Sequence, residues 1–263
     1  MIARAHVIGM GRLGRPLADR LESMNIAVER WGRQDSGGVR GLSHWPERQK
    51  GDAVFLALPD DSIEQVANRL KATLSPDAIL VHHAGAVPLD VLPVENHRRA
   101  VMWPPMTFGT ERAPDWNALP MGVETDHEPL FQWAQELAPH AFRLTAESRP
   151  QLHLGAVLGG NLTAAWIGAV EMYLKAHALP GAVLRPLIEA SVSKALTGNA
   201  LDTVSGPASR NDRTTLDQQV KALGSSGANP PDFAEIHRLL TNLILSHHGH
   251  PTLPPIQAAT GEH

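Results

Sequence analysis

The 263-residue sequence contains no cysteine. This absence excludes disulfide bonds, thiolate nucleophiles and zinc or iron–sulfur centres held by cysteine. Lysine is scarce: it occurs at positions 50, 71, 175, 194 and 221, and the other cations are scattered arginines. Because the formal net charge is −4 and no basic block is present, we expect no nucleic-acid partner.

Targeting and membrane signals are also missing from the sequence. No run of about 18 apolar residues is free of polar interruptions, so we expect no membrane span. The first residues, MIARAHVIGMGRLG, lead directly into a strand and a glycine turn, unlike a signal peptide. We therefore expect a cytoplasmic location. The hydrophobic content of 43% is ordinary for a globular protein with a substantial core.

The first half alternates short apolar runs with amphipathic stretches. This pattern predicts an α/β fold, with a Rossmann-type doubly wound parallel sheet over residues 1–149. Asp60 or Asp61 is in position to cap the second helix. The expected strands span 5–8, 26–31, 52–58, 78–82, 99–103 and 122–124, the last at an edge, and the helices span 13–24, 63–74 and 128–137.

The second half has no convincing strand and predicts an all-α domain over residues 150–248. The expected helices span 151–178, 180–196, 213–223 and 231–246. Apolar residues of 151–178 occur on more than one face, so we expect that helix to be buried in its own domain and also in a subunit contact. We therefore expect a homodimer formed through the C-terminal helical domain. Residues 249–263 form a proline-rich tail that we expect to be extended or mobile.

A glycine turn follows the first predicted strand and opens the first predicted helix. Gly9 permits a tight turn, Gly11 lets a diphosphate approach the backbone, and Gly14 allows close helix–strand packing. The helix N-terminus supplies free N–H groups and a partial positive charge. We assign cofactor binding to the whole turn: Gly9, Met10, Gly11, Arg12, Leu13 and Gly14.

The end of the second strand decides between NAD and NADP. An acidic residue there would accept hydrogen bonds from the ribose 2′-hydroxyl, but this chain has Trp31, Gly32 and Arg33. Arg33 can bind a 2′-phosphate and Trp31 can lie against the adenine, which favours NADP(H) as the cofactor. Glu29 is the competing candidate, and it lies too early if the strand reaches Trp31.

Several longer motifs resemble the bacterial proteins that join a Rossmann-like domain to a C-terminal DUF2520 domain. The resemblance implies an NADP-dependent oxidoreductase that is distantly related to pyrroline-5-carboxylate reductase and to the 6-phosphogluconate and β-hydroxyacid dehydrogenases. It extends from the first strand to about Ser246. The motifs that carry it are Leu58-Pro59-Asp60-Asp61-Ser62-Ile63, His83-Ala84-Gly85-Ala86, Leu152-His153-Leu154-Gly155-Ala156-Val157 with Asn161, and Gly206-Pro207-Ala208-Ser209-Arg210-Asn211-Asp212.

The chain departs from these families at two motifs. Trp103-Pro104-Pro105-Met106-Thr107-Phe108 stands where the family often has His-Pro-Leu/Met-Gln-Thr-Phe, so the His and the Gln are replaced. Val157 occupies the position of the catalytic lysine of the β-hydroxyacid dehydrogenases, four residues before Asn161. The resemblance therefore does not imply acid catalysis by a lysine.

The substrate is expected above the carboxyl ends of the strands. Asn161 can orient a carbonyl, or can form a helix–helix hydrogen bond, and His83 or His153 can donate a proton. Arg210 and Asp212 can bind a substrate carboxylate, or can simply pair and cap the helix that follows. The further residues that we assign to the cofactor are Leu58 and Pro59, and those assigned to the substrate are Gly85, Trp103 and Thr107. We expect no metal site, and the histidines at 247, 248 and 250 to be solvated.

These features favour an NADP-dependent oxidoreductase that acts on a small carbonyl, imine or hydroxy acid. The replaced family residues keep a second hypothesis open, a dinucleotide-binding sensor without catalysis. A transferase that uses the same cleft has only the analogy of the fold behind it.

Overall fold

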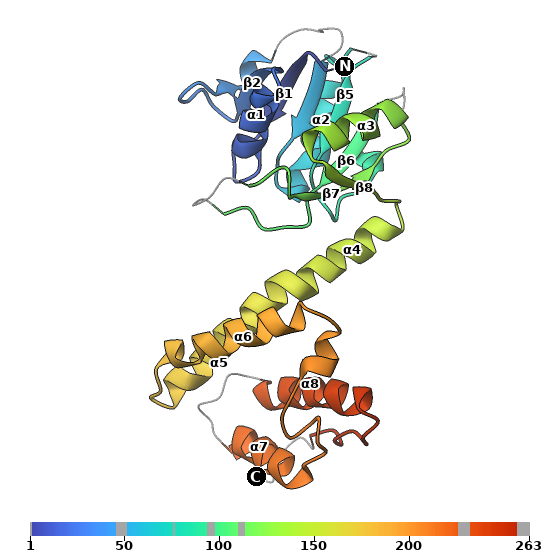
Figure 1. Cartoon of the computed structure of the whole chain (residues 1–263). Coiled ribbons are helices and arrows are strands. Elements are labelled where there is room, and N and C mark those ends of the chain that lie inside the picture. The colour runs from blue at the N-terminus through green and yellow to red at the C-terminus, as the bar shows by residue number, and fades with distance from the viewer. Residues whose placement is uncertain are drawn as a thin grey trace, which may run out of the picture. The chain divides into compact units, whose positions relative to one another are not determined.

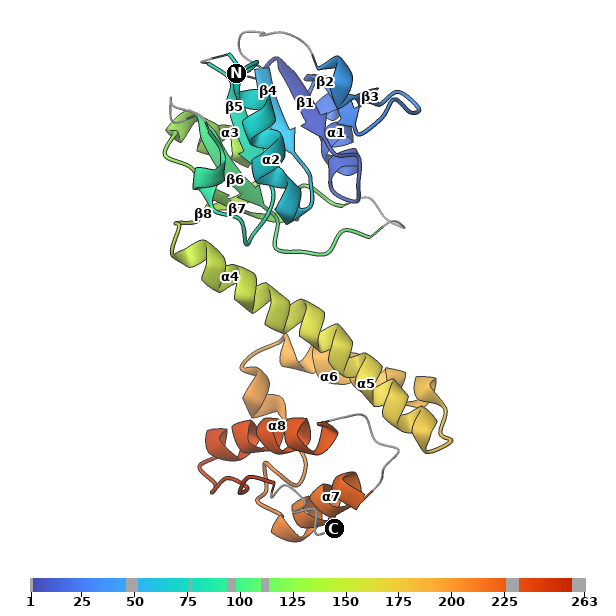
Figure 2. The same cartoon turned by 180° about the vertical axis from the view of Figure 1, so that it is seen from behind.

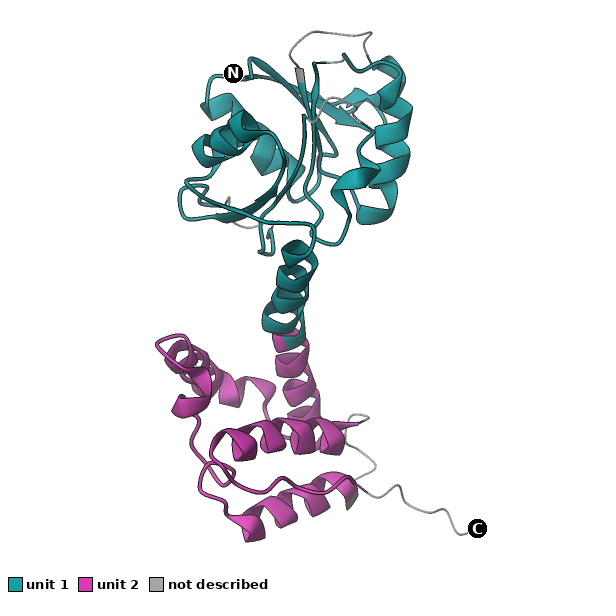
Figure 3. Cartoon of the chain, turned by 90° about the vertical axis from the view of Figure 1, so that its right-hand side faces the viewer, with its two compact units in different colours: residues 1–162 teal, residues 163–263 magenta. Residues whose placement is uncertain are grey.

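The computed structural model describes residues 2–45, 52–75, 77–93, 98–109, 114–225 and 232–256. An α/β sheet region comes first and a helical region follows it (Figures 1 and 2). The predicted fold class is confirmed: a mostly parallel, Rossmann-like sheet is followed by helices. The chain divides into two compact units, residues 1–162 and 163–263 (Figure 3).

The sheet has eight strands in the order β3-β2-β1-β4-β5-β6-β7-β8. All neighbouring pairs are parallel except β6 and β7. The order reverses between β1 and β4, which makes that place the switch point where doubly wound folds bind ligands. The strands are β1 (Arg4–Ile8), β2 (Ala27–Gly32), β3 (Arg40–Gly41), β4 (Asp52–Leu56), β5 (Ile79–His82), β6 (Arg99–Trp103), β7 (Pro120–Glu124) and β8 (His140–Arg143).

Helices cover both faces of the sheet because successive residues of its strands point to opposite sides. On β4, Phe55 belongs to the core beneath α1 (Gly14–Ser23) and α3 (Glu128–Leu137). Its neighbour Val54 belongs to the core beneath α2 (Asp60–Lys71) and the short helix η2 (Leu89–Val91). Figures 1 and 2 show α1 and α3 on one side of the sheet and α2 on the other.

Two predictions for the sheet region, one on its edge strand and one on a helix cap, were wrong. We expected β7 at an edge, but β8 pairs beside it in parallel and forms the edge. The run HAFR of β8 is four residues long and buries only Ala141, so it has no alternating pattern that would predict a strand. We also expected Asp60 or Asp61 to cap α2, but Pro59 is the N-cap residue and both aspartates lie in the first turn.

The boundary between the two units lies within a single apolar helix, Ser148–Ala176. It consists of α4 (Ser148–Ala156), a π-helical segment η3 (Val157–Leu162) and α5 (Thr163–Ala176). The change from strands to helices occurs close to the predicted boundary at 149, while the compact units divide at 162. By length and composition alone this helix could cross a membrane, a test that core helices of other proteins also pass.

The second unit continues with short helices and an extended tail. Its remaining helices are η4 (Gly181–Leu184), α6 (Arg185–Ala195), η5 (Ala200–Thr203), α7 (Arg213–Ser225) and α8 (Phe233–His247). The described part of the tail, up to residue 256, has no regular secondary structure and is held to α8: Asn242 donates to the Leu253 carbonyl and accepts from its N–H. Residues 257–263 lie outside the described part of the chain.

Candidate functional site

The glycine turn lies at the carboxyl end of β1, beside β4, and its three glycines differ in their surroundings. Gly9 has a φ of +98°, and a Cβ on it would lie 2.3 Å from the Ala57 carbonyl oxygen. A Cβ on Gly14 would lie 1.7 Å from the Gly9 carbonyl oxygen. A Cβ on Gly11 would meet nothing within 4 Å. Gly9 and Gly14 are therefore required by the fold, whereas Gly11 keeps an open space.

The N-terminus of α1 follows Gly11 directly in the chain, and the Arg15 N–H donates to the Gly11 carbonyl oxygen at 3.3 Å. The helix has no side-chain cap and no acidic residue in its first turn. Arg12 is exposed, while Arg15 is tied to the turn by a 2.9 Å hydrogen bond from Nε to the Met10 carbonyl oxygen. Free N–H groups and the helix dipole favour an anion at such a position.

At the end of β2 the side chain of Arg33 is exposed, whereas that of Trp31 is buried. The strand extends to Gly32, and Arg33 follows it with an exposed side chain. Glu29 lies in mid-strand beside Arg4 and Arg40, at 3.8 and 3.3 Å, so it is not the acidic residue that NAD recognition requires. Arg33 is therefore the exposed cation at the end of β2, while Asp35 two residues later accepts a hydrogen bond from the Gly41 N–H.

The assignment of Trp31 to the adenine requires correction. Its indole is 0% exposed, and Nε1 donates to His6 Nδ1 at 3.1 Å. Trp45 packs against the ring at 4.9 Å, and the Arg40 guanidinium lies 5.8 Å from the ring centroid. The side chain alternation of β2 directs Trp31 into the core, so the indole has no free face for a base.

Leu58 and Pro59 connect β4 to α2 at the same edge of the sheet. Leu58 is partly buried, and its Cδ2 lies 3.0 Å from a Cβ placed on Gly9. Pro59 is exposed and begins α2. The structure thus places this pair directly beside the glycine turn.

A second group of predicted residues meets after β5. The Trp103 and His153 rings are 5.4 Å apart, and both pack over Gly85. A Cβ on Gly85 would lie 2.6 Å from His153 Cδ2 and 2.7 Å from Trp103 Cε2. Gly85 is therefore a site of close packing between the sheet and α4, and the space above it is filled by these two rings.

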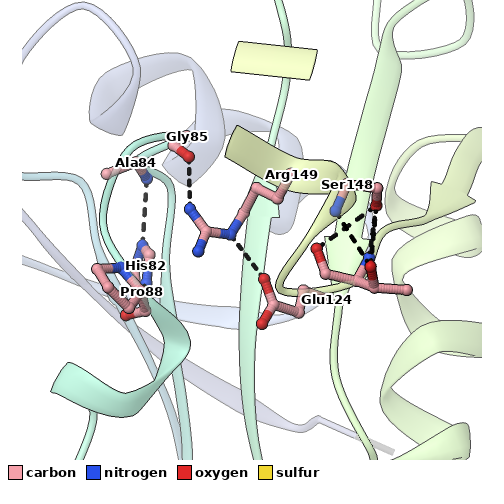
Figure 4. A network of polar contacts seen from close by, with 8 residues as sticks. His82, Ala84, Gly85, Pro88, Glu124, Ser148 and Arg149 are labelled. Atoms are coloured by element: carbon pink, nitrogen blue, oxygen red, sulfur yellow. Dashed lines mark hydrogen bonds and ion pairs between the residues drawn. The ribbon is translucent and has the colours of Figure 1, made fainter. Parts of the chain in front are cut away.

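Arg149, which the sequence analysis did not single out, joins this group to the sheet (Figure 4). It is 2% exposed, and its Nε donates to Glu124 Oε2 at 2.6 Å while Nη1 donates to the Gly85 carbonyl oxygen. One step before it, Ser148 and Thr145 exchange backbone-to-side-chain hydrogen bonds that define the start of α4. Arginine is usually exposed to solvent, and no local sequence pattern predicts that an arginine at a helix start is buried.

His82 and His83 are both neutral at physiological pH. Burial lowers the pKa of each to about 4, with the charge of His83 adding to the effect on His82. Ala84 N–H donates to His82 Nδ1, and His83 Nδ1 lies 2.6 Å from the Met102 carbonyl oxygen and donates to it. His83 stacks on Phe55 inside the core, so it is poorly suited to the proton-donor role that we expected.

The remaining candidates are exposed. Asn161 lies in the π-helical segment η3, a type of distortion that is frequent at functional sites. The π turn also changes the angular relation between Asn161 and His153 that a regular α-helix would give. Thr107 lies in the loop after β6, and Arg210 lies in the second unit. Asp212 caps α7 through Thr215, as one of the two readings proposed.

Two other places among the described residues carry polar groups. A cavity of about 230 Å³ lies at the amino ends of β5 and β6, where Arg98 is engaged by Asp77. In the second unit, His247 pairs with Asp202 and His250 contacts the Ser209 carbonyl.

The sheet order, the glycine turn and the following helices define a Rossmann-like dinucleotide-binding fold with a helical C-terminal region. Residues 119–244 match the model of the DUF2520 family, a domain of unknown function. No curated protein sequence matches the chain.

Solved structures share this architecture at low sequence identity. A candidate NADP oxidoreductase from Bacteroides fragilis is 22% identical, with a TM-score of 0.76 over 93% of this chain and 98% of that one. Pyrroline carboxylate reductase from Plasmodium falciparum, solved with NADP bound, is 12% identical, with a TM-score of 0.57 over 92% and 99%. Reductive aminase from Aspergillus terreus, in complex with NADPH, is 11% identical, with a TM-score of 0.63 over 95% and 97%. At these identities the likeness establishes the fold.

The buried ion pair gives a direct test of how α4 is attached. Glu124→Gln leaves Arg149 buried without its counter-charge and should lower the free energy of unfolding by about 3–5 kcal/mol in urea denaturation. The matched variant Glu128→Gln breaks an exposed pair with Arg143 and should cost less than about 1 kcal/mol. Equal losses of unfolding free energy in the two variants would show that the buried position of Arg149 does not depend on the charge of Glu124.

Proposed function

We propose that this protein is an NADP-dependent oxidoreductase that transfers hydride between NADP(H) and a small carbonyl, imine or hydroxy acid. The observation that carries the proposal is the open space at Gly11. The fold requires glycine at positions 9 and 14 but not at 11, where a side chain would meet nothing. A glycine that the protein's own packing does not need is explained by a ligand that approaches its backbone.

The residues present fit a dinucleotide with a 2′-phosphate. The uncapped N-terminus of α1 and the exposed Arg12 suit a diphosphate, and the exposed Arg33 suits the additional phosphate. Leu58 and Pro59 line the same edge of the sheet. When bound, the nicotinamide would supply or accept the hydride. The relatives solved with NADP or NADPH support this cofactor by their fold.

The protein's own residues must bind and orient the substrate and move a proton. His153 is the better proton donor of the two candidates, because His83 is buried, neutral and hydrogen-bonded through Nδ1. His153 is held against Trp103 at the start of α4 and is only partly buried. The exposed amide of Asn161 can orient a carbonyl or imine, and Thr107 and Arg210 remain candidates for further substrate contacts.

A sensor without catalysis is the second candidate, and one observation favours it. Val157 stands at the position of the catalytic lysine of the β-hydroxyacid dehydrogenases, and Trp103 stands at the position of the histidine in the family motif. His83 is buried in the core. A sensor would keep the cofactor site and lose turnover, so binding and turnover must be measured separately.

Cofactor binding is tested first at the glycine turn. Gly11→Ala should weaken NADPH binding at least about tenfold in a fluorescence titration, because the added methyl group enters the space proposed for the diphosphate. Its thermal midpoint should stay unchanged, since the methyl group meets no protein atom. Gly14→Ala should lower the midpoint sharply. Unaltered NADPH affinity in folded Gly11→Ala would remove the basis of the proposal.

Cofactor preference is tested at Arg33. Arg33→Ala should reduce NADPH affinity about 10- to 100-fold and leave NADH affinity unchanged, because only NADPH carries the 2′-phosphate. Arg12→Ala is the control: the diphosphate is common to both cofactors, so this variant should weaken both equally. Equal binding of NADPH and NADH by the unmodified protein would discard the NADP assignment.

Turnover is tested by the oxidation of NADPH with a panel of small aldehydes, ketones and imines, and by the reverse reaction with hydroxy acids. Asn161→Ala should reduce kcat about 10- to 100-fold with the NADPH dissociation constant unchanged. A protein that binds NADPH tightly and turns over no member of the panel would favour the sensor.

A further inference from the structure

A cavity of about 230 Å³ lies in the first unit, at the amino ends of the parallel strands. Ile79 opens β5, Arg98 directly precedes β6 and Ile2 precedes β1, and these strands run in the same direction. The glycine turn follows the carboxyl end of β1, so the length of that strand, about 16 Å, lies between the two places. The cavity is therefore separate from the proposed cofactor site. Its lining residues are Ile2, Asp77, Ile79, Arg98, His127, Pro129, Leu130 and Trp133.

The apolar wall of the cavity is part of the core of the sheet. Ile2, Leu130 and Trp133 are 5%, 2% and 7% exposed and belong to the core cluster beneath α1 and α3. The Trp133 ring also packs against Phe55 on β4, with 5.6 Å between the ring centroids. Because these side chains are held by core residues that do not line the cavity, the cavity is formed before any ligand binds.

Arg98 supplies a guanidinium that is held in place beside the cavity. The Leu80 N–H donates to the Arg98 main-chain carbonyl oxygen at 3.1 Å, which fixes the backbone of Arg98 to β5. Arg98 Nη1 donates to the Asp77 carbonyl oxygen at 2.9 Å and lies 3.5 Å from Asp77 Oδ1. Both contacts use the same nitrogen. Among the described residues, the N–H groups of Nε and Nη2 therefore remain available for a further acceptor.

The geometry at Arg98 favours an anion over a cation. A carboxylate can accept two parallel hydrogen bonds from Nε and Nη2 without displacing Asp77. A cation would have to approach the Asp77 carboxylate, where the guanidinium would repel it. Asp77 neutralises Arg98 only weakly, because 3.5 Å exceeds the usual hydrogen-bond length and the two side chains are 55% and 38% exposed.

His127 supplies a second polar side chain on the wall of the cavity. It is the N-cap residue of α3, but its side chain makes no capping hydrogen bond. Its Nδ1 is buried and has no hydrogen-bond partner among the described residues. Buried polar atoms are normally hydrogen-bonded, so the contacts within the protein do not account for this ring. A ligand that carries a polar group beside His127 can supply a partner.

We propose that this cavity binds a small carboxylic acid with an apolar body. Its carboxylate lies on Arg98 beside His127, and its apolar part packs against Leu130 and Trp133. A volume of about 230 Å³ is below that of pockets for drug-sized ligands, roughly 300–1,000 Å³, so the ligand has on the order of ten non-hydrogen atoms. The lining includes no residue assigned to the cofactor or the substrate, so this inference does not depend on the proposed function.

The test uses phenylacetate, which joins a carboxylate to an aromatic ring, as its probe. Calorimetric titration of the unmodified chain should show saturable binding, and the thermal midpoint should rise as phenylacetate is added. Phenylacetamide and phenethylamine are similar in size but neutral and cationic, so each should bind at least about tenfold more weakly. Absence of saturable phenylacetate binding, or equal or tighter binding of either analogue, would overturn the proposal.

Two arginine variants locate the bound carboxylate. Arg98→Gln should raise the phenylacetate dissociation constant at least about tenfold, because it removes the guanidinium from the cavity. Arg99→Gln is the matched control and should leave the constant unchanged. Arg99 donates to the Leu92 carbonyl oxygen at 3.0 Å and lies 3.5 Å from Asp90, a pairing like that of Arg98, but it does not line the cavity. Equal effects of the two variants would show that the carboxylate does not bind at Arg98.

A third variant distinguishes this cavity from the proposed cofactor site. Arg33→Ala, at the end of β2, should leave phenylacetate affinity unchanged. Loss of phenylacetate binding in Arg33→Ala with retention in Arg98→Gln would place the probe at the other end of the sheet and overturn the proposal. The thermal midpoint of Arg98→Gln should stay close to that of the unmodified chain, because an exposed ion pair contributes little. The comparison of the three probes needs no variant and remains valid even if Arg98→Gln does not fold.

Discussion

The close approach of the glycine turn to β4 is the constraint on which the sheet edge depends. Gly14 lies so near the Gly9 carbonyl that no side chain fits, and Gly9 lies too near the Ala57 carbonyl after β4 for a side chain of its own. These contacts place the N-terminus of α1 at the switch point between β1 and β4. The same closeness orders Leu58 and Pro59 beside the turn. Gly11 is the exception, since it contributes open space and not packing.

A buried ion pair attaches the start of α4 to the sheet near β5 and β7. Arg149 brings the start of α4 to Glu124 on β7 and to the Gly85 carbonyl, so three elements distant in sequence meet at one guanidinium. Such a pair adds little net stability over an apolar replacement but defines one arrangement, because either charge alone is costly when buried. His153 owes its place over Gly85 to this arrangement. Any role of His153 in proton transfer therefore depends on Arg149 and Glu124, which hold α4 in position and do not themselves contact a substrate.

The two units differ in how they obtain a hydrophobic core. The sheet has helices on both faces and buries nearly every inward side chain of its central strands. The helical unit leaves leucines on α6 and α8 exposed. A sheet can be covered by helices that are adjacent in sequence, whereas short helices without a sheet must find their apolar contacts elsewhere.

The sequence by itself determined the fold class, most element positions and the glycine turn, because these depend on local periodicity and on spacings within one βαβ unit. Arg33 belongs to this set, since its place follows from the length of β2. Tertiary structure alone decided the burial of Trp31 and His83, which pack against His6 and Phe55 on neighbouring strands. It also decided the position of β8 and the partners of Arg149. These depend on pairing between distant segments, and the sequence carries no local signal for such contacts.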